Sequence, residues 1–183
     1  QLQIDEQNRL YDQLTCDMKE QLDLLEGLLK SDRVTGRQRI AKICVLSAYM
    51  KRRSNLCLLA ESEKQTSTKE LELCISESLE SMRLCNLFCS FESHCSGKTA
   101  AGELILLYDV VQQIFQQLLA DAGAVMLWLR AENDSLFLKL QSDGRLCTEF
   151  PAMERWSAAG GSFSVSCGPD AAWLILQKEG GKG

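Results

Sequence analysis

The N-terminal third of the chain has the apolar spacing of two long amphipathic helices. In the first of them, apolar positions recur at three- and four-residue steps and form one stripe over about seven helical turns. These positions are Ile4, Leu10, Leu14, Met18, Leu22, Leu25 and Leu29. Turn-forming residues follow from Ser31 to Gly36, and a second apolar stripe runs from Arg37 to about Ala60. A lone hairpin leaves half of each stripe in water, so we expect two copies to form a four-helix bundle.

The charges of these two predicted helices are complementary. The first helix is rich in acids, whereas the stretch from Arg33 to Ala60 contains basic residues and no Asp or Glu. One interpretation is ion pairing between helices together with a solvated basic face, because exposed pairs are common and individually weak. The other is that Lys51, Arg52 and Arg53 form a docking patch for an acidic partner or a phosphate. The spacing does not choose between them.

The rest of the chain predicts helices packed on a mixed sheet. Ser67 and Glu70 have the spacing of a capping box, which predicts a third helix to about Cys85. The expected segments after it are a strand at 87–92, a loop at 94–101, a helix at 102–122, and strands at 124–130, 135–141, 162–167 and 171–177. The predicted fold class is α+β: a long helical hairpin that forms a four-helix-bundle dimer, followed by an α/β sandwich.

Composition and charge limit the location and the partners of the chain. Its 183 residues have a net charge of -5 and a pI of about 5.0, which disfavours nucleic acid or an anionic membrane as a partner. Nine cysteines, several of them in apolar helical stretches, indicate free thiols and a cytoplasmic protein. No run reaches the roughly 20 apolar residues of a membrane span. Because the chain begins at Gln1, we expect a fragment of a longer protein, whose missing part could anchor it to a membrane.

Few residues can support catalysis or metal binding. His94 is the only histidine in the sequence, which excludes multi-histidine metal sites and limits any Ser-His-Asp triad to that residue. A zinc site made of Cys85, Cys89, His94 and Cys95 would have irregular spacing, and free cysteines are common buried apolar residues, so we predict no metal. The sequence also has no glycine-rich loop of the P-loop or dinucleotide type.

Several segments together resemble the motifs of one known protein family. The helix at 107–122, LYDVVQQIFQQLLADA, resembles the helix that carries the asparagine box of that family. As in the family, a hairpin follows that ends in Ser142–Arg145, and Gly160 and Gly161 precede a later strand. Near the N-terminus, Arg9–Leu14 is similar to the phosphoacceptor motif at the start of the family's dimerisation hairpin. The family is that of the sensor histidine kinases, and the resemblance implies an ATPase-like fold, shared with gyrase and Hsp90-type ATPases, from about residue 67 to residue 177.

The departures from the family pattern fall on residues that its chemistry requires. Tyr11, followed by Asp12, stands at the position of the phosphorylated histidine. A phenol with a pKa of about 10 is a poor nucleophile at neutral pH and cannot form a phosphoramidate. In the helix, Gln113 stands where the resemblance implies a Glu that acts on the attacking group, and Gln117 where it implies a magnesium-binding Asn. Both replacements lose the short, charged or tightly placed oxygen that such a site uses.

The turn after the hairpin departs in the same way. Ser142 replaces an Asp that would bind adenine, Leu146 replaces a glycine, and Cys147–Ala159 is short for a glycine-rich nucleotide lid. We therefore predict a degenerate nucleotide site and expect no bound cofactor. Its positions are Gln113, Gln117, Ser142, Asp143 and Gly144. The plainer interpretation is that Asp143 and Gly144 form only a tight turn, that the glutamine-rich helix is only amphipathic, and that Tyr11 is a surface tyrosine.

These features predict a hairpin dimerisation domain at 1–62, a degenerate ATPase-like domain at 66–178 and a flexible tail at 179–183. We expect a histidine-kinase-like signalling module, catalytically impaired, that acts by homodimerisation through residues 4–60 and by contact with a response regulator or an upstream sensor region. The alternative is an active sensor kinase that binds ATP and magnesium through atypical residues, with Asp109 or Asp121 on the metal. A phosphotransfer intermediary similar to the sporulation phosphotransferases needs a histidine on the hairpin, and none precedes His94.

Overall fold

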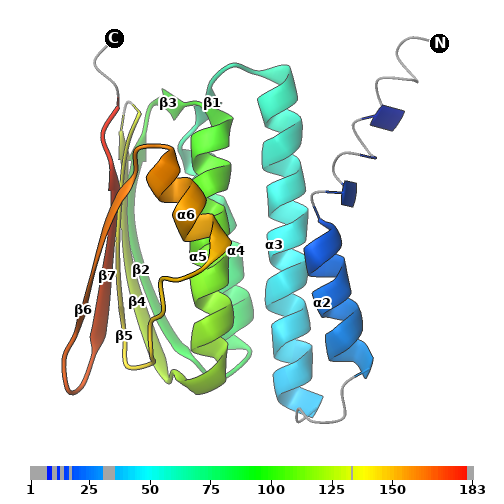
Figure 1. Cartoon of the computed structure of the whole chain (residues 1–183), viewed down its shortest axis with the longest axis vertical. Coiled ribbons are helices and arrows are strands. Elements are labelled where there is room, and N and C mark those ends of the chain that lie inside the picture. The colour runs from blue at the N-terminus through cyan, green and yellow to red at the C-terminus, as the bar shows by residue number, and fades with distance from the viewer. Residues whose placement is uncertain are drawn as a thin grey trace.

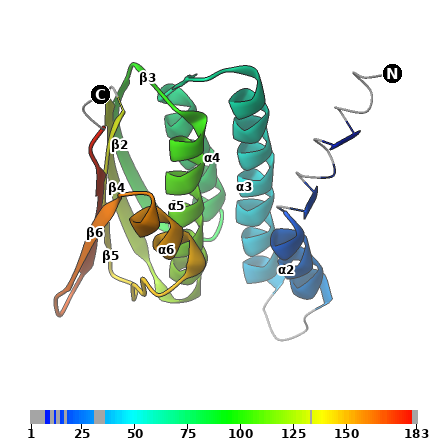
Figure 2. The ribbon, with the colours of Figure 1, turned by 45° about the horizontal axis from the view of Figure 1, so that its top comes forward.

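The structure is a computed structural model that describes residues 8, 9, 12, 15, 16, 18–30, 36–132 and 134–180. The described part forms three layers: a sheet, a middle layer of α4, α5 and α6, and an outer layer of α3 with α2 on its far side (Figures 1 and 2). The helices are α2 (Lys19–Lys30), α3 (Gly36–Ser62), α4 (Lys69–Arg83), α5 (Ala101–Asp121) and α6 (Pro151–Ala158). None of these helices is long and apolar enough to cross a membrane.

The main sheet has five strands in the order β2-β4-β5-β7-β6, with β2 parallel to β4 and the other neighbours antiparallel. Its strands are β2 (Phe88–Ser96), β4 (Ala124–Glu132), β5 (Ser135–Ser142), β6 (Ser162–Cys167) and β7 (Ala172–Lys178), and β1 (Thr66–Ser67) pairs with β3 (Lys98–Thr99) in a small second sheet. Alternation explains the buried face, since Leu136, Leu138 and Leu140 of β5 are buried while their neighbours are partly exposed. The predicted α+β class and mixed sheet are confirmed.

Two local predictions are wrong. The loop predicted at 94–101 is instead the end of β2 followed by β3, because Thr66 and Ser67 supply a partner strand for Lys98 and Thr99. The capping box is also absent: Ser67 Oγ accepts a hydrogen bond from the backbone N–H of Lys69 at 3.3 Å, one residue before Glu70. Thr68 occupies the N-cap position of helix α4, and its side chain makes no capping hydrogen bond.

Helix α3 packs against α4 and α5 as well as against α2. Its residues Val45, Tyr49 and Leu56 are almost fully buried and join the same core as Leu71 of α4 and Leu104 of α5. The expectation that the α3 stripe is covered only within a hairpin dimer is therefore wrong, because α4 and α5 offer an apolar face within the same chain. The part of the first stripe that precedes Met18, and residues 181–183 of the predicted tail, lie largely or wholly outside the described residues.

Candidate functional site

The five predicted nucleotide-site positions come together at the C-terminal half of α5. Gln113 and Gln117 lie one turn apart on this helix, and Ser142–Gly144 lies where β5 ends, beside the α5–β4 connection. The segment after Gly144 then runs back along α5 to the start of α6. The predicted positions therefore lie along the C-terminal half of α5 and beside its end, and each has hydrogen bonds or packing contacts within the chain.

Both glutamine side chains hold the returning segment against α5. The Oε1 atom of Gln117 accepts a hydrogen bond from the backbone N–H of Cys147 at 3.0 Å. The Oε1 atom of Gln113 accepts one from the backbone N–H of Ala152 at 3.4 Å, at the start of α6. These amide oxygens are acceptors for the protein's own backbone, so a metal or nucleotide would have to compete with both contacts.

The carboxylate of Asp143 caps the connection between α5 and β4. Its Oδ1 atom accepts hydrogen bonds from the backbone N–H groups of Gly123 and Ala124, both at 2.9 Å. Ser142 completes the junction: its hydroxyl donates to the carbonyl of Ala124 at 2.9 Å and accepts from the N–H of Gly144 at 3.0 Å. Both side chains therefore have local structural roles.

Gly144 packs too closely on the end of α5 to carry a side chain. A Cβ atom at this position would lie 2.7 Å from the Cβ atom of Ala122 and 3.1 Å from a methyl group of Leu118. A glycine here lets the backbone approach the helix itself. Gly144, one of the predicted degenerate-site positions, thus has a packing role of its own.

Helix α6 packs against α5 and was not predicted from the sequence. Ala152, Met153 and Trp156 are buried, and the indole N–H of Trp156 donates to the carbonyl of Ser162 at 3.0 Å. The Trp156 ring lies so close to Gly161 that an added Cβ atom would come within 2.3 Å of it. A proline at the first helical position and apolar residues three and four apart were the available signals.

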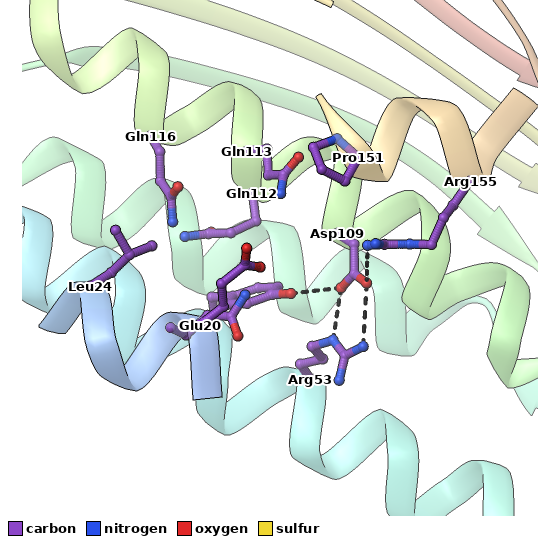
Figure 3. Close-up of a pocket in the computed structure, with 11 residues that line it drawn as sticks. Glu20, Leu24, Arg53, Asp109, Gln112, Gln113, Gln116, Pro151 and Arg155 are labelled. Atoms are coloured by element: carbon purple, nitrogen blue, oxygen red, sulfur yellow. Dashed lines mark hydrogen bonds and ion pairs between the residues drawn. The ribbon is translucent and has the colours of Figure 1, made fainter. Parts of the chain in front are cut away.

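A buried carboxylate links α5 to α3 and α6 at the N-terminal side of this region. Asp109 is 5% exposed, and its Oδ1 atom accepts hydrogen bonds from the Tyr49 hydroxyl at 2.7 Å and from Arg53 Nε at 2.9 Å (Figure 3). Its Oδ2 atom accepts from Arg53 Nη2 at 3.4 Å and lies 3.5 Å from Arg155 Nη2. Both carboxylate oxygens thus have hydrogen-bond donors, and a magnesium ion would have to compete with them.

Tyr49 and Arg53 both stay protonated at neutral pH. Burial raises the pKa of Tyr49, and the neighbouring Asp109 carboxylate raises it further, so the phenol stays a neutral donor. Burial works to lower the pKa of Arg53, but the charge and hydrogen bonds of Asp109 prevail and raise it. Tyr49 therefore donates its hydrogen bond as a neutral phenol, and Arg53 and Asp109 form an ion pair. The sequence did not predict this cluster. The signal was the i,i+4 spacing of Tyr49 and Arg53 in a stretch without acids.

The consecutive basic residues of α3 pair with two different carboxylates. Lys51 Nζ lies 2.8 Å from Glu77 of α4, Arg52 also pairs with Glu77, and Arg53 pairs with Asp109 of α5. The hydrogen bond from Lys51 lowers the pKa of Glu77, burial opposes this, and the contact with Arg52 lowers it again. Ion pairing between helices is the interpretation that these contacts support, but the acids come from α4 and α5 rather than from the first helix.

Among the described residues, the remaining candidates do not assemble into a site. Tyr11 lies outside the described residues, and Asp12 is exposed. His94 is an exposed residue of β2 whose Nε2 atom lies 3.0 Å from the Glu132 carboxylate. Within the described ranges, no group of three or more His, Cys, Asp or Glu side chains is placed to hold a metal.

Comparison with known proteins rests on structure alone. No family model matches the sequence, and no curated protein matches it. The histidine kinase domain of the blue-light activated histidine kinase EL346 from Erythrobacter litoralis superposes with a TM-score of 0.55 at 12% identity, over 88% of this chain and 94% of that domain. The fold is that of a histidine kinase domain.

Two further structures were found to be similar to the chain. The longer EL346 protein superposes with a TM-score of 0.54 at 11% identity, over 93% of this chain and 58% of that one. A bacterial phosphotransferase gives a TM-score of 0.49 at 11% identity, over 94% of this chain and 96% of that one. The histidine-kinase fold implied by the sequence motifs is confirmed by the EL346 comparison.

Proposed function

We propose that this chain is a signalling module that keeps the histidine-kinase fold, has closed its nucleotide-binding surface with its own backbone, and acts by dimerisation and protein contact. A histidine-kinase-like fold is that of a signal-transduction module. One observation carries the closure: Gln113 and Gln117 hold the 147–152 segment against α5 through backbone hydrogen bonds. Asp143 adds to it, because its Oδ1 atom is bound to Gly123 and Ala124.

Calorimetric titration of the chain with ATP and magnesium tests the closure. We expect no saturable heat at micromolar nucleotide, because both amide oxygens and the Asp143 carboxylate already have backbone donors. Incubation with radiolabelled ATP should likewise leave no label on the protein. Micromolar binding would refute the closure, and acid-labile label would favour the active-kinase alternative, in which ATP and magnesium are cofactors.

Exposed apolar side chains on α2 and α3 support dimerisation through residues 4–60. Leu22, Leu24 and Leu29 of α2 and Ile40 and Leu58 of α3 are 42–64% exposed, although α3 already buries its other face on α4 and α5. A second copy of the hairpin would remove this apolar surface from water. A response regulator or an upstream sensor region is the further partner we propose, with the chain acting as the cytoplasmic part of a sensor.

Light scattering after size exclusion tests the dimer. We expect a mass of about 41 kDa, twice the 20.5 kDa of one chain, at micromolar concentration. Ile40→Glu should lower this mass toward that of a single chain, because it places a charge in the apolar interface. Leu84→Glu, at an equally exposed leucine just after α4, is the matched control and should leave it unchanged. A wild-type mass of one chain would refute dimerisation.

A further inference from the structure

The outer face of the main sheet is not covered by any of the described helices. All of these helices lie on the other side of the sheet, where the leucines of β5 are buried (Figures 1 and 2). Alternate residues of the central strands β4, β5 and β7 therefore point to the outer face. They include large apolar side chains that remain partly exposed. These are Met126, Trp128, Phe137, Trp173 and Ile175.

Two basic residues lie among these apolar side chains. The strand register places Lys139 opposite Trp128 and Arg130 opposite Phe137. The Nζ atom of Lys139 lies 5.2 Å from the centroid of the Trp128 ring and 4.5 Å from that of the Trp173 ring, so the lysine bridges the two indoles. Aromatic and basic side chains thus alternate across the centre of the face. We call this set of five residues the outer patch.

The outer patch has the composition of a protein interface. Aromatic residues and arginine are enriched in interface cores, and a contiguous apolar patch with a polar rim marks an interaction site. The exposed serines of β6 that share this face form such a rim. A hollow of about 490 Å³, lined in part by Trp128, Arg130 and Phe137, gives room for a large side chain of a partner.

The charges of the outer patch favour an acidic partner. Among the described residues, neither Arg130 nor Lys139 has a carboxylate within ion-pair distance. The acids of this face lie toward β2, where Glu132 pairs with His94 at 3.0 Å and Glu92 is exposed. A partner that covers the patch must supply carboxylates, because it removes both cations from water. A second copy centred on the patch would instead place like charges together.

A helix has the dimensions to cover the outer patch. Helices are the elements that usually cover the faces of a mixed sheet, and a helix with its side chains is about 10–12 Å wide. Trp128 and Trp173 lie on strands two places apart, which corresponds to about 10 Å. We propose that the outer patch binds an amphipathic helix of a partner protein, whose apolar stripe contacts the aromatic rings and whose flanking Asp or Glu residues pair with Arg130 and Lys139.

Fluorescence anisotropy of two labelled synthetic peptides, titrated with the full chain, tests this proposal. Both are helical peptides of about 20 residues with one leucine stripe, and the residues beside the stripe are glutamates in one and lysines in the other. We expect the glutamate peptide to bind at least about tenfold more tightly. Joint substitution Arg130→Glu and Lys139→Glu should reverse this preference. Joint substitution Lys64→Glu and Lys98→Glu makes the same change in net charge at exposed positions outside the main sheet and should preserve it.

A second pair of variants tests the apolar part of the contact. Trp128→Ala should weaken binding of the glutamate peptide by about tenfold or more, because tryptophans at the centre of an interface carry much of its binding energy. Leu84→Ala, at an exposed leucine outside the sheet, is the control and should leave the affinity unchanged.

Four results would overturn this inference. They are no saturable anisotropy change at hundreds of micromolar chain, equal affinity for both peptides, a preference that the Arg130 and Lys139 substitutions do not change, and a lower solution mass of that double variant, which would assign the patch to a second copy. Thermal unfolding checks that the variants fold, and Arg130→Glu alone, at an exposed residue, replaces the double variant if it does not. Nucleotide closure and the hairpin dimer can fail without affecting this inference.

Discussion

In the C-terminal half of α5, Gln113 and Gln117 accept hydrogen bonds from the backbone of the segment that leads into α6. In the N-terminal half, the Asp109 carboxylate instead accepts hydrogen bonds from side chains of α3 and α6, including the charged guanidinium of Arg53. The first arrangement closes a surface within the sheet-bearing part of the chain, and the second attaches the outer helix to it. Neutral hydrogen bonds are individually modest, whereas a buried charge is costly to leave unpaired, so the two halves should respond differently to mutation.

Asp109→Ala should give the largest effect. It leaves the Arg53 side chain, which is 14% exposed, without its counter-ion and the Tyr49 hydroxyl without its acceptor. We expect a loss of about 3–5 kcal/mol in the free energy of unfolding, measured by urea denaturation at neutral pH. Asp121→Ala, which removes an exposed carboxylate from the same helix, is the control and should change stability by less than about 0.5 kcal/mol. Equal effects of the two variants would show that the Asp109 cluster does not attach α3.

Gly144→Ala, beside the C-terminal half of α5, should have an intermediate effect on the free energy of unfolding. Its Cβ atom would meet the Cβ atom of Ala122 at 2.7 Å and force the turn away from α5. The expected cost is about 1–3 kcal/mol by the same denaturation measurement. Gly102→Ala, in the first turn of α5 with open space around it, should be neutral or stabilising. If Gly144→Ala were as well tolerated as Gly102→Ala, the turn would not be packed on α5 as described.

Glu77→Gln should have the smallest effect and a defined pH dependence. The pKa of Glu77 is lowered by Lys51 and Arg52 in the folded state, so its contribution to stability is present above its ordinary pKa of about 4.3 and is lost as pH falls through the folded value. We expect the wild type to be more stable by about 0.5–1 kcal/mol at neutral pH. This difference should vanish in acid. A difference that is unchanged at about pH 3 would contradict the pairing with Lys51 and Arg52.

The sequence predicted elements well where their signal was local. Short apolar runs between turn residues located β5 and β6 to within a residue, and the run of apolar residues without proline located α5 equally well. Helix α6 was missed because a two-turn helix has little periodicity and the resemblance suggested a lid there. The loop at 94–101 was misassigned because the pairing of β3 with β1 depends on residues some 30 positions away.

Partners and contacts were harder to predict than elements. The periodicity of α3 defines an apolar face, but it does not say whether that face meets α2, α4 or another copy. The glutamines of α5 show the same limit. Gln112, Gln113 and Gln117 lie within two turns of the helix and are chemically identical, yet two of them bind backbone N–H groups and one is buried without a described partner. Only the register of the returning segment distinguishes them, and that register is a tertiary property.

The central claim is that backbone N–H groups of the chain itself bind the α5 side chains that would face a nucleotide. A crystal structure grown with saturating ATP and magnesium tests this claim most directly. We predict that Gln117 Oε1 still accepts from Cys147 and that no nucleotide lies beside it. An ordered nucleotide between Gln117 and Asp143, with the 147–152 segment displaced, would contradict the claim.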